Sequence, residues 1–498
     1  VTLCVLGGLA GLYTIVGGLM AVVLTESLDT IVLLIGSICI AVVGFFAVGG
    51  WDGLETAMAE MAEAKQLATT SPGEKDASPI PAKDIPDNVG KHLSIVRGHG
   101  DASGLPWYAV LLGYPIIGIW YWCTDQTIVQ RVLGAKDENH ARVGPLFAGF
   151  IKILPVFIFV LPGIICLALI HQGKLGPLPT MVNAEGLTVP DTKATLDTLI
   201  RGLLPPGMKG LVAAALLAAL MSTVSGALNS IATLFSYDLY KRWRPDTSDR
   251  KLVGIGRIVT GCAMVAAIAW SPYVERLGGI FDGINKMIAF IAPPITVLFL
   301  WGVFWRKATG RAALTTAWFG TLLGLLMFLL TFFGFFEQWT AHIGFQIPFL
   351  LAAVYLFVVC SLVLVLCSYS RRLVLQISAV GTVVGVVAVT AILAGGLDLL
   401  ATGTIAGSET AKAGPSLVFP AWLPWVVVPA FLYCFSSPLL LLMTLLVPPQ
   451  PESPERNDLV WKSPLEPLRG EAWRGIGNFR VLTVVLIVTM IAFYWWFA

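Results

Sequence analysis

Residues 208–236 read MKGLVAAALLAALMSTVSGALNSIATLFS, and this stretch decides the fold class. A helix needs about 20 mostly apolar residues to cross the hydrocarbon core of a membrane, and this run meets that length. Small and polar residues recur in it at intervals of three and four, which places them on one face of a helix. The stretch therefore predicts a membrane helix with one polar stripe, made of Ala219, Ser222, Thr223, Gly226, Asn229 and Ser230.

The rest of the chain has the same apolar character. Of its 498 residues, 56% are hydrophobic, 32 are Lys or Arg and 30 are Asp or Glu, and the mean hydropathy is +0.81. Soluble domains are about a quarter charged, so this composition excludes a soluble enzyme, and a net charge of +2 offers no polybasic surface to nucleic acid. We expect an all-α polytopic membrane protein with spans near 1–16, 21–48, 107–131, 146–170, 208–236, 252–272, 284–304, 313–335, 347–367, 374–395, 419–447 and 480–497.

Basic residues in the connecting loops orient these spans. Lys and Arg gather after every second span from the third onward, and the intervening loops carry few of them. Basic loops lie on the cytoplasmic side of a membrane, so segment 49–105 is expected outside and loop 448–479 inside. In the external segment, Glu55, Glu60 and Glu63 occur among Ala and Met at helical spacing and indicate a short amphipathic helix.

The span at 107–131 combines helix-breaking residues with polar ones. It contains WYWCTDQ at 120–126, preceded by Gly113, Pro115 and Gly118. An opened helix at membrane depth is tolerated only where its backbone lines a cavity, so we expect an interrupted helix here. Aromatic rings beside the Asp125 carboxylate suit a polyol, and an interfacial aromatic belt is the structural alternative.

Charged residues occur in two further spans, where each is a functional candidate because charge in a bilayer is costly. Lys152 begins the fourth span, either as a donor to a cavity or with its amine extended to the headgroups. Glu26 and Asp29 begin the second span. They are either acidic residues of a first helical turn or carboxylates that retain a cation.

Two more spans carry polar residues whose role the sequence leaves open. Asp282, Asn285 and Lys286 precede the pair at 293–294, which is Pro-Pro and predicts another discontinuous helix. In the polar stripe, hydroxyls at Ser222 and Thr223 with a carbonyl three residues earlier are hard oxygen ligands of the kind that Na⁺ needs. Close packing of two helices explains a small-residue stripe equally well.

These residues resemble the sodium:solute symporter family, and within it the sodium/glucose cotransporter branch. The resemblance covers about residues 1–310 closely and the last span more weakly. The motifs that carry it lie in this order at 13–26, 120–131, 149–152, 161–163, 204–211, 220–223, 228–230, 281–282 and 293–294.

The resemblance implies a LeuT-type inverted repeat of two five-helix units and sugar uptake driven by Na⁺ through alternating access. Such a carrier is a multi-pass protein of the cell membrane (plasma or inner membrane), is not an enzyme, and takes a monosaccharide as its partner. Residues 1–310 would form the symporter core from core helices four to ten, and 311–498 peripheral C-terminal helices. The expected alternatives are a Na⁺ symporter for another small solute, such as myo-inositol, an amino acid or a carboxylate, and a membrane solute sensor that does not transport.

The resemblance also assigns candidate site residues. Ala219, Ser222 and Thr223 would bind Na⁺, and Glu26 would take part in cation coupling. Tyr121 would be the inner-gate tyrosine with Trp122 beside it, Lys152 a donor in the sugar cavity, and Asn285 an amide ligand, joined by the Asp125 carboxylate.

The sequence departs from the family pattern in several places. Val1 falls in the fourth core helix, so we expect this chain to be truncated at its N-terminus and, as it stands, not to transport. Glu26 replaces an Asp, Asn285 stands where sugar carriers commonly have Gln, and Gly118 stands where some bacterial members have an amide. The spans at 347–367 and 374–395 are additional to the usual C-terminal part.

Overall fold

The computed structural model describes residues 2–70, 96–97, 105–182, 188–271, 280–332, 425–446, 460–463 and 465–496. Over these residues the chain is mostly helical, with a single antiparallel pair of short strands, β1 (Thr180–Val182) and β2 (Thr188–Pro190). Eight described helices are long and apolar enough to cross a membrane. The predicted class of all-α polytopic membrane protein is confirmed.

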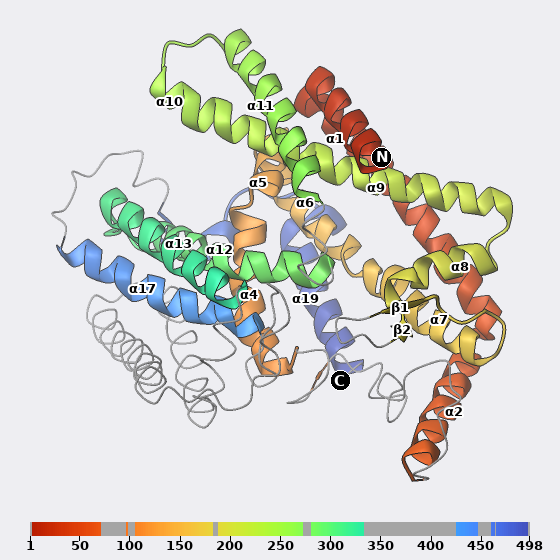
Figure 1. Ribbon diagram of the computed structural model, residues 1–498. Coiled ribbons are helices and arrows are strands. Elements are labelled where there is room, and N and C mark those ends of the chain that lie inside the picture. The colour runs from red at the N-terminus through yellow and green to blue at the C-terminus, as the bar shows by residue number, and fades with distance from the viewer. Residues whose placement is uncertain are drawn as a thin grey trace, which may run out of the picture. The chain divides into compact units, whose positions relative to one another are not determined.

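The chain divides into two compact units (Figure 1). The first contains Val1–Ile95, Gln130–Ala269 and Trp473–Ala498, and the second contains Val96–Val129 and Trp270–Ala472. The expected boundary at residue 310 stays a prediction. The spans expected at 347–367 and 374–395 lie outside the described residues.

The first unit begins with one long helix, α1 (Thr2–Val48). Two spans were expected here, at 1–16 and 21–48; a membrane-length apolar segment is present at Val22–Val48, and one continuous helix joins it to the residues before it. The physical reason is that the intervening residues include Gly17 and Gly18 but no proline. A glycine costs a helix about 1 kcal/mol relative to Ala and removes no hydrogen bond, so the backbone continues through the pair.

Helix α1 packs against α9 (Pro206–Thr233), the helix of the polar stripe. Gly36 makes the approach close, because a Cβ built on it would lie 2.6 Å from Cβ of Ala215. Further along, the Tyr13 hydroxyl donates to the Met221 carbonyl at 3.4 Å. α9 continues as a π-helical segment, η4 (Leu234–Tyr240), and then as α10 (Lys241–Trp243), before α11 (Asp249–Trp270).

The amphipathic helix expected in segment 49–105 is confirmed as α2 (Gly50–Thr70), and its external location stays a prediction. Its buried face includes Leu54, Met58 and Met61, which join a core cluster with α7 (Leu161–His171). The turn between α1 and α2 is held by Gln172, whose Nε2 donates to the Val48 carbonyl at 3.2 Å. After the strands come η3 (Thr192–Ala194) and α8 (Thr195–Leu203).

The fourth span is interrupted near its middle. Helix α6 (Glu138–Ile151) ends at Ile151, with Lys152 as its C-cap residue. A π-helical turn, η2 (Val156–Val160), then leads into α7. At its start, the Asp137 carboxylate caps α6 by accepting from the backbone N–H of His140 at 2.9 Å, which lowers the pKa of that carboxyl. The last helix, α19 (Phe479–Trp496), preceded by η9 (Gly475–Gly477), packs against α6.

The second unit is a bundle of α4 (Trp107–Cys123), α12 (Ile280–Phe304), α13 (Gly310–Phe332) and α17 (Val428–Leu446), with the short turns η7 (Trp425–Val427) and η8 (Glu466–Leu468). Figure 1 shows α12, α13 and α17 side by side, and they pack on one another. The discontinuity expected at 293–294 is wrong, because α12 runs through both prolines. Hydroxyls and close helix contacts stabilise such a helix, and Thr296 Oγ1 donates to the Ala292 and Ile116 carbonyls at 3.1 and 3.0 Å.

Glycines set how closely the second unit packs. A Cβ on Gly113 in α4 would lie 1.7 Å from the Val426 carbonyl oxygen, whereas one on Gly118 would meet nothing within 4 Å. A backbone carbonyl cannot move aside as a flexible side chain can. Gly113 is therefore needed for the close contact between α4 and η7.

We predict that Gly113→Ala lowers the melting temperature of the purified protein and that Gly118→Ala, the matched change one helical face away, does not. Overpacking costs roughly 1–3 kcal/mol when the surroundings cannot relax. Tryptophan fluorescence during heating in detergent measures both variants. Equal melting temperatures for the two variants would contradict the packing of α4 on η7.

Candidate functional site

The polar stripe of α9 carries a ladder of hydroxyl-to-carbonyl hydrogen bonds. Thr223 Oγ1 donates to the Ala219 carbonyl at 2.9 Å, and Ser225 Oγ donates to the Ser222 carbonyl at 2.9 Å. A hydroxyl that gives its hydrogen to its own helix keeps its lone pairs for another partner, and a carbonyl oxygen has two acceptor sites. The stripe thus offers neutral hard oxygens of the kind that bind an alkali cation.

The stripe is not fully covered by protein. Thr223 is exposed and Ser222 is half-buried, whereas Ser225 and Ser230, further along the same helix, are buried. Ser230 Oγ donates to the Gly226 carbonyl at 2.9 Å, so the buried end is satisfied within the helix. Ser222 and Thr223, the two residues whose hydroxyls are expected to bind Na⁺, therefore lie in the part of the stripe that is not fully buried.

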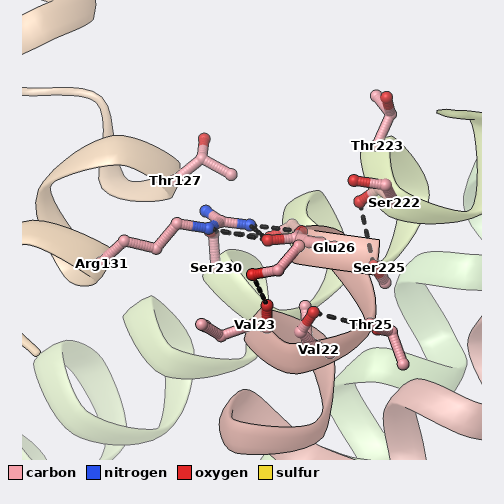
Figure 2. A network of polar contacts seen from close by, with 12 residues as sticks. Val22, Val23, Thr25, Glu26, Thr127, Arg131, Ser222, Thr223, Ser225 and Ser230 are labelled. Carbon is pink, nitrogen blue, oxygen red and sulfur yellow. Dashed lines mark hydrogen bonds and ion pairs between the residues drawn. The ribbon is translucent and has the colours of Figure 1, made fainter. Parts of the chain in front are cut away.

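Glu26 lies in the interior of α1, in the same unit as the stripe (Figure 2). Its interpretation as a first-turn acidic residue is wrong, because α1 begins at Thr2. The carboxylate is paired with Arg131 in the last turn of α5 (Gln126–Leu133). Arg131 Nε lies 2.9 Å from Oε2, and Nη2 lies 2.5 Å from Oε1 and 2.7 Å from Oε2. The side chains of Arg131 and Glu26 are 30% and 14% exposed.

This partner of Glu26 and two neighbouring contacts were not predicted from the sequence. Gln130 Nε2 donates to Thr233 Oγ1 at 3.0 Å, which joins α5 to the end of α9. Tyr13 donates to the carbonyl that precedes Ser222. The sequence did contain one signal for the ion pair. Glu26 and Arg131 are an acidic and a basic residue within apolar spans, and a charged residue in a membrane is usually paired with an opposite charge.

In the second unit, Tyr121 and Trp122 end α4 with their rings edge to face, with centroids 5.5 Å apart. The helix breaks at Thr124 and Asp125, inside the motif at 120–126, so the interruption expected in the span 107–131 is confirmed; α4 itself continues through Gly113, Pro115 and Gly118. The Asp125 carboxylate caps α5, accepting from the backbone N–H of Thr127 at 2.9 Å and also from the Thr127 hydroxyl. A helix cap is the structural role that the sequence interpretation had not weighed.

The structure locates the two remaining candidate residues, Asn285 and Lys152, but does not bring them together in one site. Asn285 lies half-buried in α12 of the second unit. Lys152 lies in the first unit, exposed, at the end of α6, and its backbone N–H donates to the Ala148 carbonyl at 2.9 Å. Because these residues belong to different units, a solute site that combines Lys152 with Asn285, Tyr121, Trp122 and Asp125 stays a prediction.

Most of these residues lie in a stretch of the chain that matches a known protein family. The model of the sodium:solute symporter family matches residues 1–320, which is more than half of the chain. The chain belongs to the sodium:solute symporter family. Members of this family are multi-pass membrane transporters and not enzymes, and they use Na⁺ as coupling ion. The predicted family resemblance and the cell-membrane location are confirmed.

Several curated relatives of this chain are sugar or polyol cotransporters by name. It is 32% identical over 327 residues to the sodium/mannose cotransporter SLC5A10 of Bos taurus, covering 65% of this chain and 52% of that protein. It is 34% identical over 339 residues to sodium/myo-inositol cotransporter 2 of Sus scrofa, covering 66% and 48%. It is 31% identical over 331 residues to sodium/glucose cotransporter 4 of Danio rerio, covering 66% and 48%. The chain thus spans about half the length of these relatives.

Among solved structures, the chain is similar to a Na⁺-coupled sialic acid symporter in a substrate-bound outward-open state. The TM-score is 0.46 at 22% identity, and the match covers 64% of this chain and 59% of the other. The inverted-repeat arrangement of this chain stays a prediction.

The cap at Asp125 leads to a test of its role. We predict that Asp125→Ala lowers stability by about 0.5–2 kcal/mol, the usual cost of losing an N-cap, while Asp125→Ser retains it. Thermal melting of both variants measures this difference. Equal melting of Ala and Ser would contradict the capping role. A loss of solute affinity in the Ser variant would give Asp125 a second role in binding.

Proposed function

We propose that the whole protein carries out Na⁺-coupled symport of a sugar of the glucose or galactose type by alternating access. The observation that supports this most directly is the oxygen set of Ala219, Ser222 and Thr223 on α9, in the same unit as the Glu26 carboxylate. The named substrates of the relatives, mannose, myo-inositol and glucose, are all polyols.

In the proposed cycle, Na⁺ is a cotransported substrate that binds first. The Ala219 and Ser222 carbonyls and the Ser222 and Thr223 hydroxyls replace part of its hydration shell. A ligand that binds one conformation more tightly shifts the population toward it, so Na⁺ favours the outward-open state in which the solute binds. The membrane potential supplies about 2.3 kcal/mol per charge per 100 mV in addition to the Na⁺ gradient.

The proposed solute contacts divide by chemistry. Tyr121 and Trp122 offer ring faces that stack on a sugar, and the tyrosine hydroxyl acts at the inner gate. Lys152 and Asn285 donate hydrogen bonds to sugar oxygens, and Asp125 accepts from sugar hydroxyls where its capping role leaves an oxygen available. In this arrangement residues 1–310 form the symporter core and 311–498 the peripheral helices.

The proposal has a same-family alternative, supported by the sodium/myo-inositol cotransporters among the relatives. Myo-inositol, like a hexopyranose, is a six-membered ring with hydroxyl groups around its edge, so it suits the same aromatic and amide side chains. Proteoliposome uptake of radiolabelled glucose, galactose, mannose and myo-inositol, each with inward Na⁺ or inward K⁺ gradients, separates the candidates. Currents induced by a solute without its accumulation would instead indicate a sensor.

For the cation site, we predict that Ser222→Ala combined with Thr223→Val raises the Na⁺ concentration for half-maximal uptake at least tenfold, equivalent to about 1.4 kcal/mol. Both changes remove a ligand oxygen and leave an apolar group. Uptake measured against Na⁺ concentration, with choline as replacement, gives the value.

Thr489→Val on α19 is the matched control. Thr489 is partly exposed, and its hydroxyl donates to the Val485 carbonyl at 2.8 Å, the same local bond as that of Thr223. We expect it to leave the Na⁺ dependence unchanged. If the double variant kept the Na⁺ dependence of the unaltered carrier, the α9 site would be wrong.

A further inference from the structure

The end of α5 is fastened to both helices of the proposed cation region. Arg131 binds Glu26 on α1, and the adjacent Gln130 binds Thr233 on α9. Thr233 is itself anchored, since its hydroxyl donates to the Asn229 carbonyl at 2.9 Å. We call Gln130 and Arg131 the α5 clasp.

Within the α5 clasp, Arg131 forms hydrogen bonds with both oxygens of the Glu26 carboxylate. Three nitrogen-to-oxygen distances between 2.5 and 2.9 Å describe a forked contact in which one guanidinium spans Oε1 and Oε2. Forked pairs of this kind are the strongest charge-assisted hydrogen bonds that proteins form. Glu26 is only 14% exposed, so solvent screens this contact less than it screens a surface pair.

An arginine at this position is a permanent cation, because its guanidinium does not lose its proton in proteins. While it holds Glu26, the charge of the carboxylate is neutralised and a second cation gains little from approaching it. A mobile cation can therefore bind the Glu26 carboxylate only if it displaces the Arg131 guanidinium. The two cations therefore compete for one carboxylate.

The clasp also contains a polar atom that this arrangement does not satisfy. Gln130 Oε1 is buried and has no hydrogen-bond partner among the described residues. A buried acceptor without a partner costs free energy, which favours an alternative position of α5 in which the oxygen is satisfied. The end of α5 is thus suited to changing its contacts.

We propose that Arg131 is a positioning residue for coupling: it occupies Glu26 when Na⁺ is absent and leaves it when Na⁺ binds, so that closure of the α5 clasp and cation occupancy exclude each other. This inference rests on the proposed Na⁺-coupled function and extends it to a residue that the sequence motifs had not assigned. By linkage, a group that competes with Na⁺ weakens Na⁺ binding by the same factor by which Na⁺ weakens its contact.

The test is a Na⁺ titration of the full chain purified in detergent, with the melting temperature as readout and NaCl exchanged for KCl at constant ionic strength. We expect Arg131→Gln to lower the Na⁺ concentration at half-maximal stabilisation at least about fivefold, the lower end of typical coupling between sites. In a Glu26→Gln background the same change should have no effect, because the contested carboxylate is gone. Arg131→Lys keeps the charge but not the fork, so its midpoint should be intermediate.

Arg201→Gln is the matched control. Arg201 pairs with Asp197 on α8 through Nε at 2.8 Å, and both side chains are largely exposed, so losing that guanidinium should leave the Na⁺ midpoint unchanged. A purely structural role for Arg131 would lower the melting temperature in both salts alike and would not move the midpoint.

Three results would overturn the proposal, and they are distinguishable. An unaltered protein with no preference for Na⁺ over K⁺ removes the proposed function and this inference together. A normal Na⁺ response with an unchanged midpoint in Arg131→Gln, or an equal shift in the Glu26→Gln background, removes the inference alone. If Arg131→Gln does not fold, Arg131→Lys decides, and a midpoint no lower than that of the unaltered protein contradicts competition.

Discussion

A hydrocarbon environment contains no water to satisfy a polar group, so each hydroxyl and charge in the membrane helices needs a partner within the protein. Along α9 and η4 that partner is the preceding turn. Thr223, Ser225, Ser230, Thr233 and Ser236 all donate to a carbonyl three or four residues earlier. Only the hydrogen atoms are used in this way. The same constraint that stabilises the helix therefore leaves the lone pairs of each hydroxyl oxygen unused by that bond, which is the chemistry a cation needs at the exposed Thr223.

Charged groups find their partners farther away in the sequence than hydroxyl groups do. No preceding turn satisfies a carboxylate, so Glu26 is paired with a residue 105 positions away in the chain. The pair ties a long helix to a short one that begins at a backbone break. Long-range ion pairs of this kind restrict how helices move relative to one another, and their low exposure makes them sensitive to any other cation that enters. Stability and coupling thus depend on the same contact.

Length and periodicity in the sequence were sufficient for the helices themselves, and the motifs at 120–131 and 220–223 were sufficient for the family. Apolar length and helical spacing are local properties, so α2 and α9 follow from them. The position of a break was harder. Gly113 and Pro115 predicted one, but Gly113 serves close packing against Val426, and the break falls at Thr124 and Asp125, where an Asp caps the next helix. The local signal, an N-cap residue before α5, was present and had been interpreted as a solute ligand.

The contacts of Glu26 lay beyond any local signal. Spacing along one helix places residues on a face, but it carries no information about which face of another helix lies opposite. The clasp of Gln130 and Arg131 could be anticipated only as a demand that the acid find a base. The proposed solute residues show the same limit, since Lys152 and Asn285 sit in different units and no pattern in the sequence relates the two.

The π-helical segment that follows α9 has an evolutionary consequence. A π turn arises when one additional residue is accommodated in an α-helix, and η4 extends over seven residues, Leu234–Tyr240. Loss of a single residue there would return the segment toward α geometry and leave the flanking faces in register. The same deletion within α9 would rotate one part of the polar stripe by about 100° relative to the other. A one-residue deletion just after the stripe therefore preserves it, whereas a deletion within the stripe separates its polar residues onto two faces.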